Sequence, residues 1–143
     1  MTYSSIEEML DAARDTLVRL SPREAQQAVR DGARLVDIRP EWQRRADGEI
    51  PGALVVERNH LEWRLHPESD ARLPQAVVGQ RWVVHCTEGY TSSLAAASLV
   101  ALGLDATDLA GGIAAWREAG LPTVAGPTPI EHVVGTTGAE EEA

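Results

Sequence analysis

The residues best suited to chemistry stand in one segment, residues 85–93, with the sequence HCTEGYTSS. It holds Cys86, the single cysteine of the chain, and the thiolate is the reactive form of that side chain. An apolar run precedes the segment and an Ala- and Leu-rich run follows it. A strand before the sulfur holds it rigidly, while loop amides and a helix N-terminus after it favour the anion. The pattern predicts a nucleophilic thiolate, and the alternative interpretation is a buried, unreactive cysteine.

The residues after Cys86 fit a loop that curls around the sulfur. Gly89 permits a tight turn, and Thr91, Ser92 and Ser93 offer short hydroxyl groups at the start of the next helix. Tyr90 either forms a wall of the pocket or is an exposed loop aromatic, and the sequence leaves both interpretations open.

The elements that position this loop alternate between short apolar strands and helices. We expect helices at residues 4–20, 22–31, 40–45, 59–65, 92–102 and 113–119, and strands at 35–38, 53–56, 82–85 and 105–109. This alternation predicts an α/β fold, with a parallel-stranded sheet flanked by helices on both faces. Ligands of such sheets bind at the carboxyl ends of the strands, which is where Cys86 is expected.

Length and charge limit the classes of function. The 143 residues suit one domain, and we divide them into an N-terminal helical extension (1–20), a domain (21–125) and a flexible acidic tail (126–143). The net charge of −9 argues against nucleic-acid and anionic membrane partners. The single cysteine and the lack of a basic N-terminal region typical of signal peptides predict a cytoplasmic protein.

Four motifs, in order, resemble those of single-domain rhodanese-like sulfurtransferases. Residues 35–39 (LVDIR) resemble the family's Asp-x-Arg strand, and residues 48–53 (GEIPGA) resemble its GHIPGA turn, with Glu49 where His is common. Residues 83–86 (VVHC) are similar to the strand that ends at the nucleophile. Residues 109–116 (LAGGIAAW) and 120–122 (GLP) resemble the closing motif. The resemblance covers roughly residues 20–122.

The resemblance implies sulfur transfer through Cys86. Its thiolate would take the outer sulfur of a small donor as a persulfide and pass it to a thiol, a protein sulfur acceptor or cyanide, without a metal or organic cofactor. The donor would be bound by the loop residues Thr87, Glu88, Gly89, Tyr90, Thr91 and Ser92. Glu88 would repel the thiosulfate dianion, so mercaptopyruvate and persulfides remain open as donors.

Three residues outside the loop are candidates for supporting the pocket. Asp37 and Arg39 either support the site or form a structural pair at the end of their strand, and the second interpretation is favoured. Arg58 either holds an anionic donor or is a solvated surface residue. The four tryptophans are expected to fill a core that lacks Phe, namely Trp42, Trp63, Trp82 and Trp116.

Two other functions fit parts of the pattern. Phosphatases of similar architecture need an Arg six positions after the Cys, and that position is Ser92 here. The alternative we retain is a non-catalytic or redox-sensing rhodanese-like binding module. The four histidines lack the spacing of metal motifs, so no metal site is expected.

Overall fold

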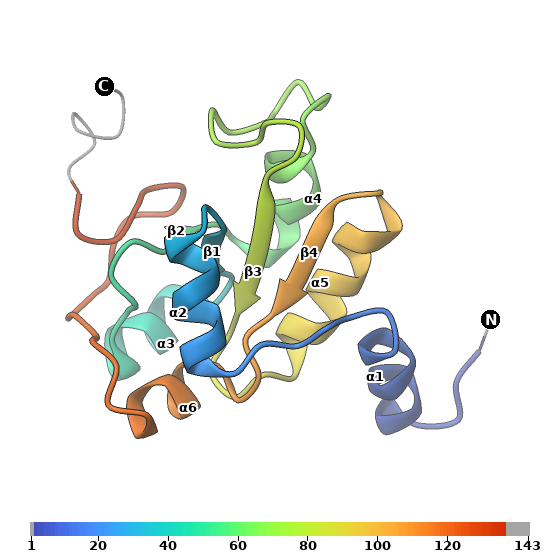
Figure 1. Cartoon of the computed structure of the whole chain (residues 1–143), viewed down its shortest axis with the longest axis horizontal. Helices are drawn as coiled ribbons and strands as arrows, with labels where there is room; N and C mark the ends of the chain where they lie inside the picture. The colour runs from blue at the N-terminus through green and yellow to red at the C-terminus, as the bar shows by residue number, and fades with distance from the viewer. Residues whose placement is uncertain (1, 137–143) are drawn as a thin grey trace.

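The computed structural model, which describes residues 2–136, has a four-stranded parallel sheet at its centre (Figure 1). The strands are β1 (Arg34–Asp37), β2 (Leu54–Val55), β3 (Arg81–His85) and β4 (Asp105–Asp108), in the order β2-β1-β3-β4. Asp37 lies opposite His85 in the register of β1 and β3. The parallel sheet and the α/β class predicted from the sequence are confirmed, and the carboxyl ends of all four strands lie along one edge.

Helices cover both faces of the sheet. On one face lie α4 (Leu61–Leu65), which follows the 3₁₀ turn η1 (Arg58–His60), and α5 (Thr91–Ala101); on the other lie α2 (Pro22–Arg30) and α6 (Gly112–Glu118) (Figure 1). Successive strand residues point to opposite faces, so Val84 packs in the α4 and α5 layer and Val83 in the α2 and α6 layer. This pattern accounts for the continuous apolar runs of β1 and β3.

The start of α2 follows its sequence signals. The Ser21 hydroxyl accepts a hydrogen bond from the Glu24 N–H (3.2 Å), and the Glu24 carboxylate accepts one from the Ser21 N–H (2.9 Å). With Pro22 at the first helical position, this is the predicted capping box. The helix α3 (Glu41–Asp47) follows β1 and leads through a turn to β2.

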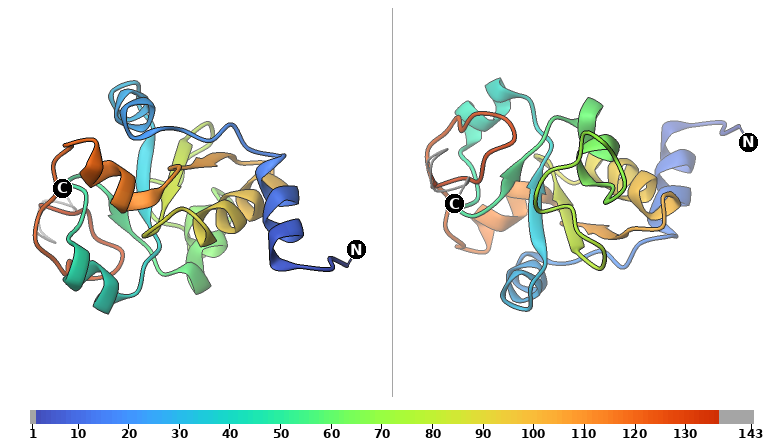
Figure 2. Two further views of the ribbon diagram at one scale, coloured as in Figure 1. Left: turned by 90° about the horizontal axis from the view of Figure 1, so that it is seen from below. Right: turned by 90° about the horizontal axis from the view of Figure 1, so that it is seen from above.

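The N-terminal segment differs from the expected helix over residues 4–20. The helix α1 (Ile6–Arg14) ends early and packs beside α5 (Figure 2). The chain then extends so that Leu20 forms a parallel bridge with Leu109, and its N–H donates to the Asp108 carbonyl (3.1 Å). Pairing with the end of β4 requires extended backbone, which is why the helix does not continue to residue 20.

The C-terminal segment runs along the β2 side of the sheet. Val124 bridges Glu49, Val133 bridges Leu54, both antiparallel, and Val134 is buried. The division into extension, domain and tail stays a prediction, yet residues 126–134 of the expected tail pack against the domain. Residues 137–143, which contain the acidic run, lie outside the described part of the chain.

The tryptophan prediction is half correct. Trp82 and Trp116 are 1% and 3% exposed and fill the two core layers, whereas Trp42 and Trp63 are 67% and 62% exposed. The latter pair lies on the short helices α3 and α4, which bury other residues (Arg44, Leu61 and Leu65). Between residues 2 and 136, no helix has the length and apolar character needed to cross a membrane.

Candidate active site

Cys86 follows directly after β3, at the carboxyl edge of the sheet. Its side chain belongs to the apolar layer under α5 and is 4% exposed. The N–H of Gly89 donates to the Cys86 Sγ (3.3 Å), so the loop curls back over the sulfur. Gly89 has a φ of +89°, and a Cβ there would lie 2.8 Å from the Gly111 nitrogen. Glycine is therefore required at this position for two reasons, the left-handed backbone and the close packing.

The N-terminus of α6 holds the carbonyl groups of the loop. The Ile113 N–H donates to the Cys86 carbonyl (3.0 Å), and the Ala114 N–H donates to the Thr87 carbonyl (3.1 Å). Gly112 makes this approach possible, because a Cβ on it would lie 2.5 Å from both carbonyl oxygens. The Gly-Gly pair of the closing motif thus anchors the nucleophile loop.

The amide groups of the loop remain available for a ligand. Over residues 2–136, no protein acceptor takes the N–H groups of Thr87, Glu88, Tyr90 and Thr91. The partial positive charge of the α5 N-terminus, which begins at Thr91, adds to them. A loop of unpaired amides at a helix N-terminus is suited to an anion.

The side chains of the loop point in several directions. The Thr87 hydroxyl donates to Gln43 Oε1 on α3 (3.1 Å), while Glu88 and Thr91 are exposed. Tyr90 is 61% exposed. Ser92 is fully buried and its hydroxyl donates to Asp108, so a ligand could use only its backbone.

His85 lies beside Cys86 in sequence but on the opposite face of the sheet. Its ring is completely buried, and neither ring nitrogen has a hydrogen-bond partner within residues 2–136. The nearest charged oxygen is Asp37 Oδ2, 3.9 Å from Nε2. Burial lowers the pKa of His85, although the attraction of Asp37 opposes this shift. A ring on the far face is not placed to accept a proton from Cys86.

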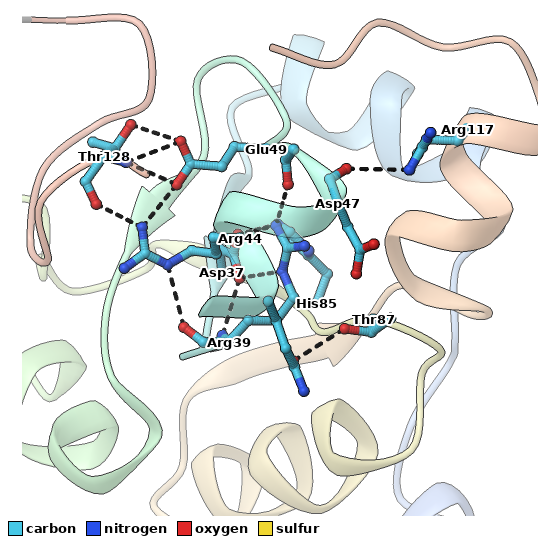
Figure 3. Close-up of polar contacts among 11 residues, drawn as sticks. Asp37, Arg39, Arg44, Asp47, Glu49, His85, Thr87, Arg117 and Thr128 are labelled. Atoms are coloured by element: carbon cyan, nitrogen blue, oxygen red, sulfur yellow. Dashed lines mark hydrogen bonds and ion pairs between the residues drawn. The ribbon is translucent and has the colours of Figure 1, made fainter. Parts of the chain in front are cut away.

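Asp37 and Arg39 form a buried ion pair at the end of β1 (Figure 3). Arg39 Nη2 donates to Asp37 Oδ2 (2.7 Å) and also to the Gly48 carbonyl (2.8 Å), which ties β1 to the turn before β2. Burial alone would raise the pKa of Asp37, but His85 and the charge and hydrogen bonds of Arg39 lower it below its ordinary value. This geometry is that of a structural ion pair, which holds the end of β1 against the turn before β2.

Arg58 lies just beyond β2 and lines an open cavity of about 610 Å³ together with Ile38, Arg39 and Asn59. Its guanidinium donates to both carboxylate oxygens of Glu62 (2.9 and 3.0 Å). The side chain is 39% exposed, so it remains accessible at the mouth of that cavity.

Glu49 replaces the family's common His and is fully buried. Arg44 Nη1 donates to Glu49 Oε2 (2.8 Å), and the Thr128 hydroxyl donates to Glu49 Oε1 (2.8 Å) (Figure 3). A Cβ on Gly126 would lie 2.5 Å from this carboxylate. The cluster fastens the C-terminal segment to the turn before β2, a role that the sequence analysis did not predict.

Three further charged groups behind the loop, buried or half-buried, were not predicted from the sequence. Arg14 and Arg19 both donate to the Gly89 carbonyl, and Arg19 forms an ion pair with the buried Asp108. The two arginines are separated by about 70 residues from the loop that they contact, so no local pattern reveals them. Within residues 2–136, no group of three or more His, Cys, Asp or Glu side chains is arranged to hold a metal ion.

Comparison with known proteins defines the class of this fold and site. The family model of the rhodanese-like domain matches residues 21–119, and the chain therefore belongs to the rhodanese-like domain family. The search of curated proteins found no match.

Solved structures agree with that assignment. A Rhodopseudomonas palustris protein of unknown function, described as a possible tyrosine phosphatase, is 31% identical, with a TM-score of 0.77 over 86% of this chain and 97% of that one. The polysulfide-sulfur transferase homodimer of Wolinella succinogenes is 25% identical, with a TM-score of 0.67 over 82% of this chain and 85% of that one. A thiosulfate sulfurtransferase from Pseudomonas aeruginosa is 28% identical, with a TM-score of 0.63 over 79% of this chain and 20% of that one.

Proposed function

We propose that this chain is a sulfurtransferase that carries sulfane sulfur as a persulfide on Cys86. The observation that carries the proposal is the curled loop, in which the Gly89 N–H donates to Sγ and the other amides have no protein acceptor among the described residues. The similarity to a polysulfide-sulfur transferase and a thiosulfate sulfurtransferase supports the same chemistry. We also propose, as the sequence predicts, that the protein is cytoplasmic.

The reaction has two steps. The Cys86 thiolate attacks the outer sulfur of thiosulfate or of a persulfide, and the S–S bond of the donor breaks with its electron pair leaving on sulfite or on a thiolate. In 3-mercaptopyruvate the thiolate attacks the single sulfur, the C–S bond breaks, and the electron pair leaves on the pyruvate enolate, which is protonated from solvent. The new Cys86 persulfide is an anion, which the loop amides and the α5 N-terminus stabilise. An acceptor thiolate or cyanide then attacks the outer sulfur, and Cys86 leaves as the thiolate.

The structure suits a carrier that needs no side-chain base. Thiolate attack on the sulfane sulfur of thiosulfate or of a persulfide transfers no proton, and His85 is turned to the other face of the sheet. Stabilising the anion is then the main task of the site, and backbone amides perform it without a titrating partner.

The test is the intact mass of the reduced protein after exposure to thiosulfate, 3-mercaptopyruvate or glutathione persulfide, separately. We expect a gain of one sulfur atom that a thiol reductant reverses, and Cys86→Ser should abolish both this gain and turnover while the circular dichroism spectrum is retained. Full activity of Cys86→Ser would show that the mechanism is wrong. No gain with any donor would favour the binding or redox-sensing module instead.

A phosphatase is the competing proposal, because the 31% identical Rhodopseudomonas palustris protein is described as a possible tyrosine phosphatase. At the position of the phosphate-binding Arg, this chain has Ser92, whose hydroxyl donates to the buried Asp108 (2.8 Å). A carboxylate behind that position and the lack of a guanidinium fork disfavour phosphoryl transfer. Hydrolysis of p-nitrophenyl phosphate that is lost in Cys86→Ser would favour the phosphatase.

A further inference from the structure

The segment that precedes the family-matched region reaches the loop of Cys86. Arg14, in the last turn of α1, and Arg19, in the extended stretch after it, both donate to the Gly89 carbonyl, at 2.8 and 2.9 Å. The N–H of the same residue donates to Cys86 Sγ. One glycine therefore holds the sulfur on one side and two guanidinium groups on the other.

The two arginines are themselves fixed by buried partners. Arg19 binds both carboxylate oxygens of Asp108 (Nε–Oδ1 2.9 Å and Nη2–Oδ2 3.1 Å), and Asp108 is completely buried at the end of β4. Arg14 Nε donates to the Ser93 hydroxyl (3.0 Å), which in turn donates to Asp108 (2.8 Å). The network therefore joins α1, the start of α5 and β4 behind the loop.

Two physical effects follow for the loop. A glycine backbone is intrinsically more flexible than that of other residues, and two charge-assisted hydrogen bonds to the Gly89 carbonyl restrict it. Two guanidinium groups and one carboxylate, that of Asp108, also leave a net positive charge among these three groups. The Arg14 guanidinium lies 5.9 Å from the ring centroid of Tyr90, which positions that side chain too.

We propose that Arg14 and Arg19 are positioning residues of the sulfur carrier: they hold the Gly89 amide on Cys86 and supply the positive charge that favours anionic donors. The catalytic meaning of this inference rests on the proposed function. The family match begins at residue 21, so the two arginines belong to the part of this chain that lies before the matched domain.

Alkylation of Cys86 tests the inference without requiring sulfur transfer. The Cys86 thiolate displaces iodide from both iodoacetate, an anion, and iodoacetamide, which is neutral. The ratio of the iodoacetate rate to the iodoacetamide rate therefore reports the charge at the sulfur. We expect Arg14→Gln to lower that ratio by about threefold at low salt. The matched control is Arg30→Gln, which removes the same charge from an exposed position at the end of α2 and should leave the ratio unchanged.

Hydrogen exchange of the Gly89 amide, measured by NMR, tests the positioning itself. In Arg14→Gln this exchange should accelerate by about tenfold relative to wild type, while amides in β3 keep their rates. Arg19→Lys keeps the charge but loses the fork that binds Asp108 and Gly89 together. Arg19→Lys should therefore keep the wild-type alkylation ratio but accelerate exchange of the Gly89 amide. This variant distinguishes the effect of the positive charge from the effect of the hydrogen-bond geometry.

Failure of the positioning role and failure of the sulfurtransferase proposal would give different results. If Arg14→Gln and Arg19→Lys both match wild type in the alkylation ratio and in Gly89 exchange, the positioning role is overturned. If the ratio and exchange change as expected but no donor loads Cys86, the sulfurtransferase proposal fails and the positioning role stands. Arg14 forms no ion pair with a carboxylate among residues 2–136, so its variant is expected to fold, and circular dichroism checks this for each protein.

Discussion

Gly112 offers a sharp test of how the Cys86 loop is anchored. Its φ is +60°, and a Cβ would lie 2.5 Å from the carbonyl oxygens of both Cys86 and Thr87. Neither oxygen can retreat freely, because each accepts a hydrogen bond from the first turn of α6. Gly112→Ala should therefore both destabilise the protein and displace the nucleophile.

Gly103 provides the matched control. Its φ is +83°, but a Cβ on this residue would meet no atom within 4 Å, so Gly103→Ala carries the left-handed strain alone. That strain costs about 1–2 kcal/mol, partly offset by the lower entropy of the unfolded chain. Gly112→Ala adds overpacking against backbone, about 1–3 kcal/mol. The difference between the two variants isolates the contact with the loop.

The assay pairs urea unfolding with the rate of persulfide formation. We expect Gly112→Ala to lower the free energy of unfolding by about 1–3 kcal/mol more than Gly103→Ala does, and to slow sulfur loading of Cys86 at least tenfold. Gly103→Ala should load sulfur at the wild-type rate. Equal destabilisation by the two substitutions, or normal loading in Gly112→Ala, would refute the argument that the first turn of α6 anchors the loop.

Two further predictions concern charge. Glu88→Gln should raise kcat/KM for thiosulfate about fivefold at low ionic strength, because it removes a carboxylate beside a dianion. The control is Glu68→Gln, which removes an exposed carboxylate in the connection before β3. An unchanged or lower kcat/KM in Glu88→Gln would contradict the repulsion. Burial lowers the pKa of His85 below its ordinary 6.5, so the unfolded chain binds a proton that the folded protein rejects. Stability should then fall as pH drops below about 6.5, by up to about 1.4 kcal/mol per pH unit, and His85→Gln should flatten this dependence in urea unfolding at pH 7.5 and 5.5. Parallel curves for wild type and His85→Gln would show that His85 does not titrate in this way.

The fold was predictable because its signals are local. The apolar runs around Val36 and Val84, and the capping box at Ser21, each depend on residues within a few positions of one another. The end of α1 was not predictable in this way. Its position is set by the pairing of Leu20 with Leu109, almost 90 residues away, and helical periodicity carries no information about such a partner.

In the site, too, the features that depend on nearby residues were predictable and those that depend on distant residues were not. The location of Cys86 after a strand and the need for glycine at position 89 follow from the motif itself. The groups that hold the loop do not, because Arg14 and Arg19 reach it from a separate segment and Asp108 from another strand. Glu49 illustrates a further limit: a carboxylate where the family often has His is explained only by Arg44 and Thr128, which the fold brings to it.

Strand geometry shows why adjacency in sequence is a poor guide to partnership here. His85 and Cys86 are neighbours, yet alternation sends the ring to the α2 and α6 layer and the sulfur to the α5 layer. Arg19 is distant in sequence, yet it binds the carbonyl of Gly89, whose N–H donates to the Cys86 sulfur. Glu88, which is exposed, and the two arginines that bind the Gly89 carbonyl are charges of opposite sign beside this loop. Because these act in opposite directions on an anionic donor, we expect Arg14→Gln and Glu88→Gln to shift the alkylation ratio of iodoacetate to iodoacetamide in opposite senses, and to cancel in the double variant.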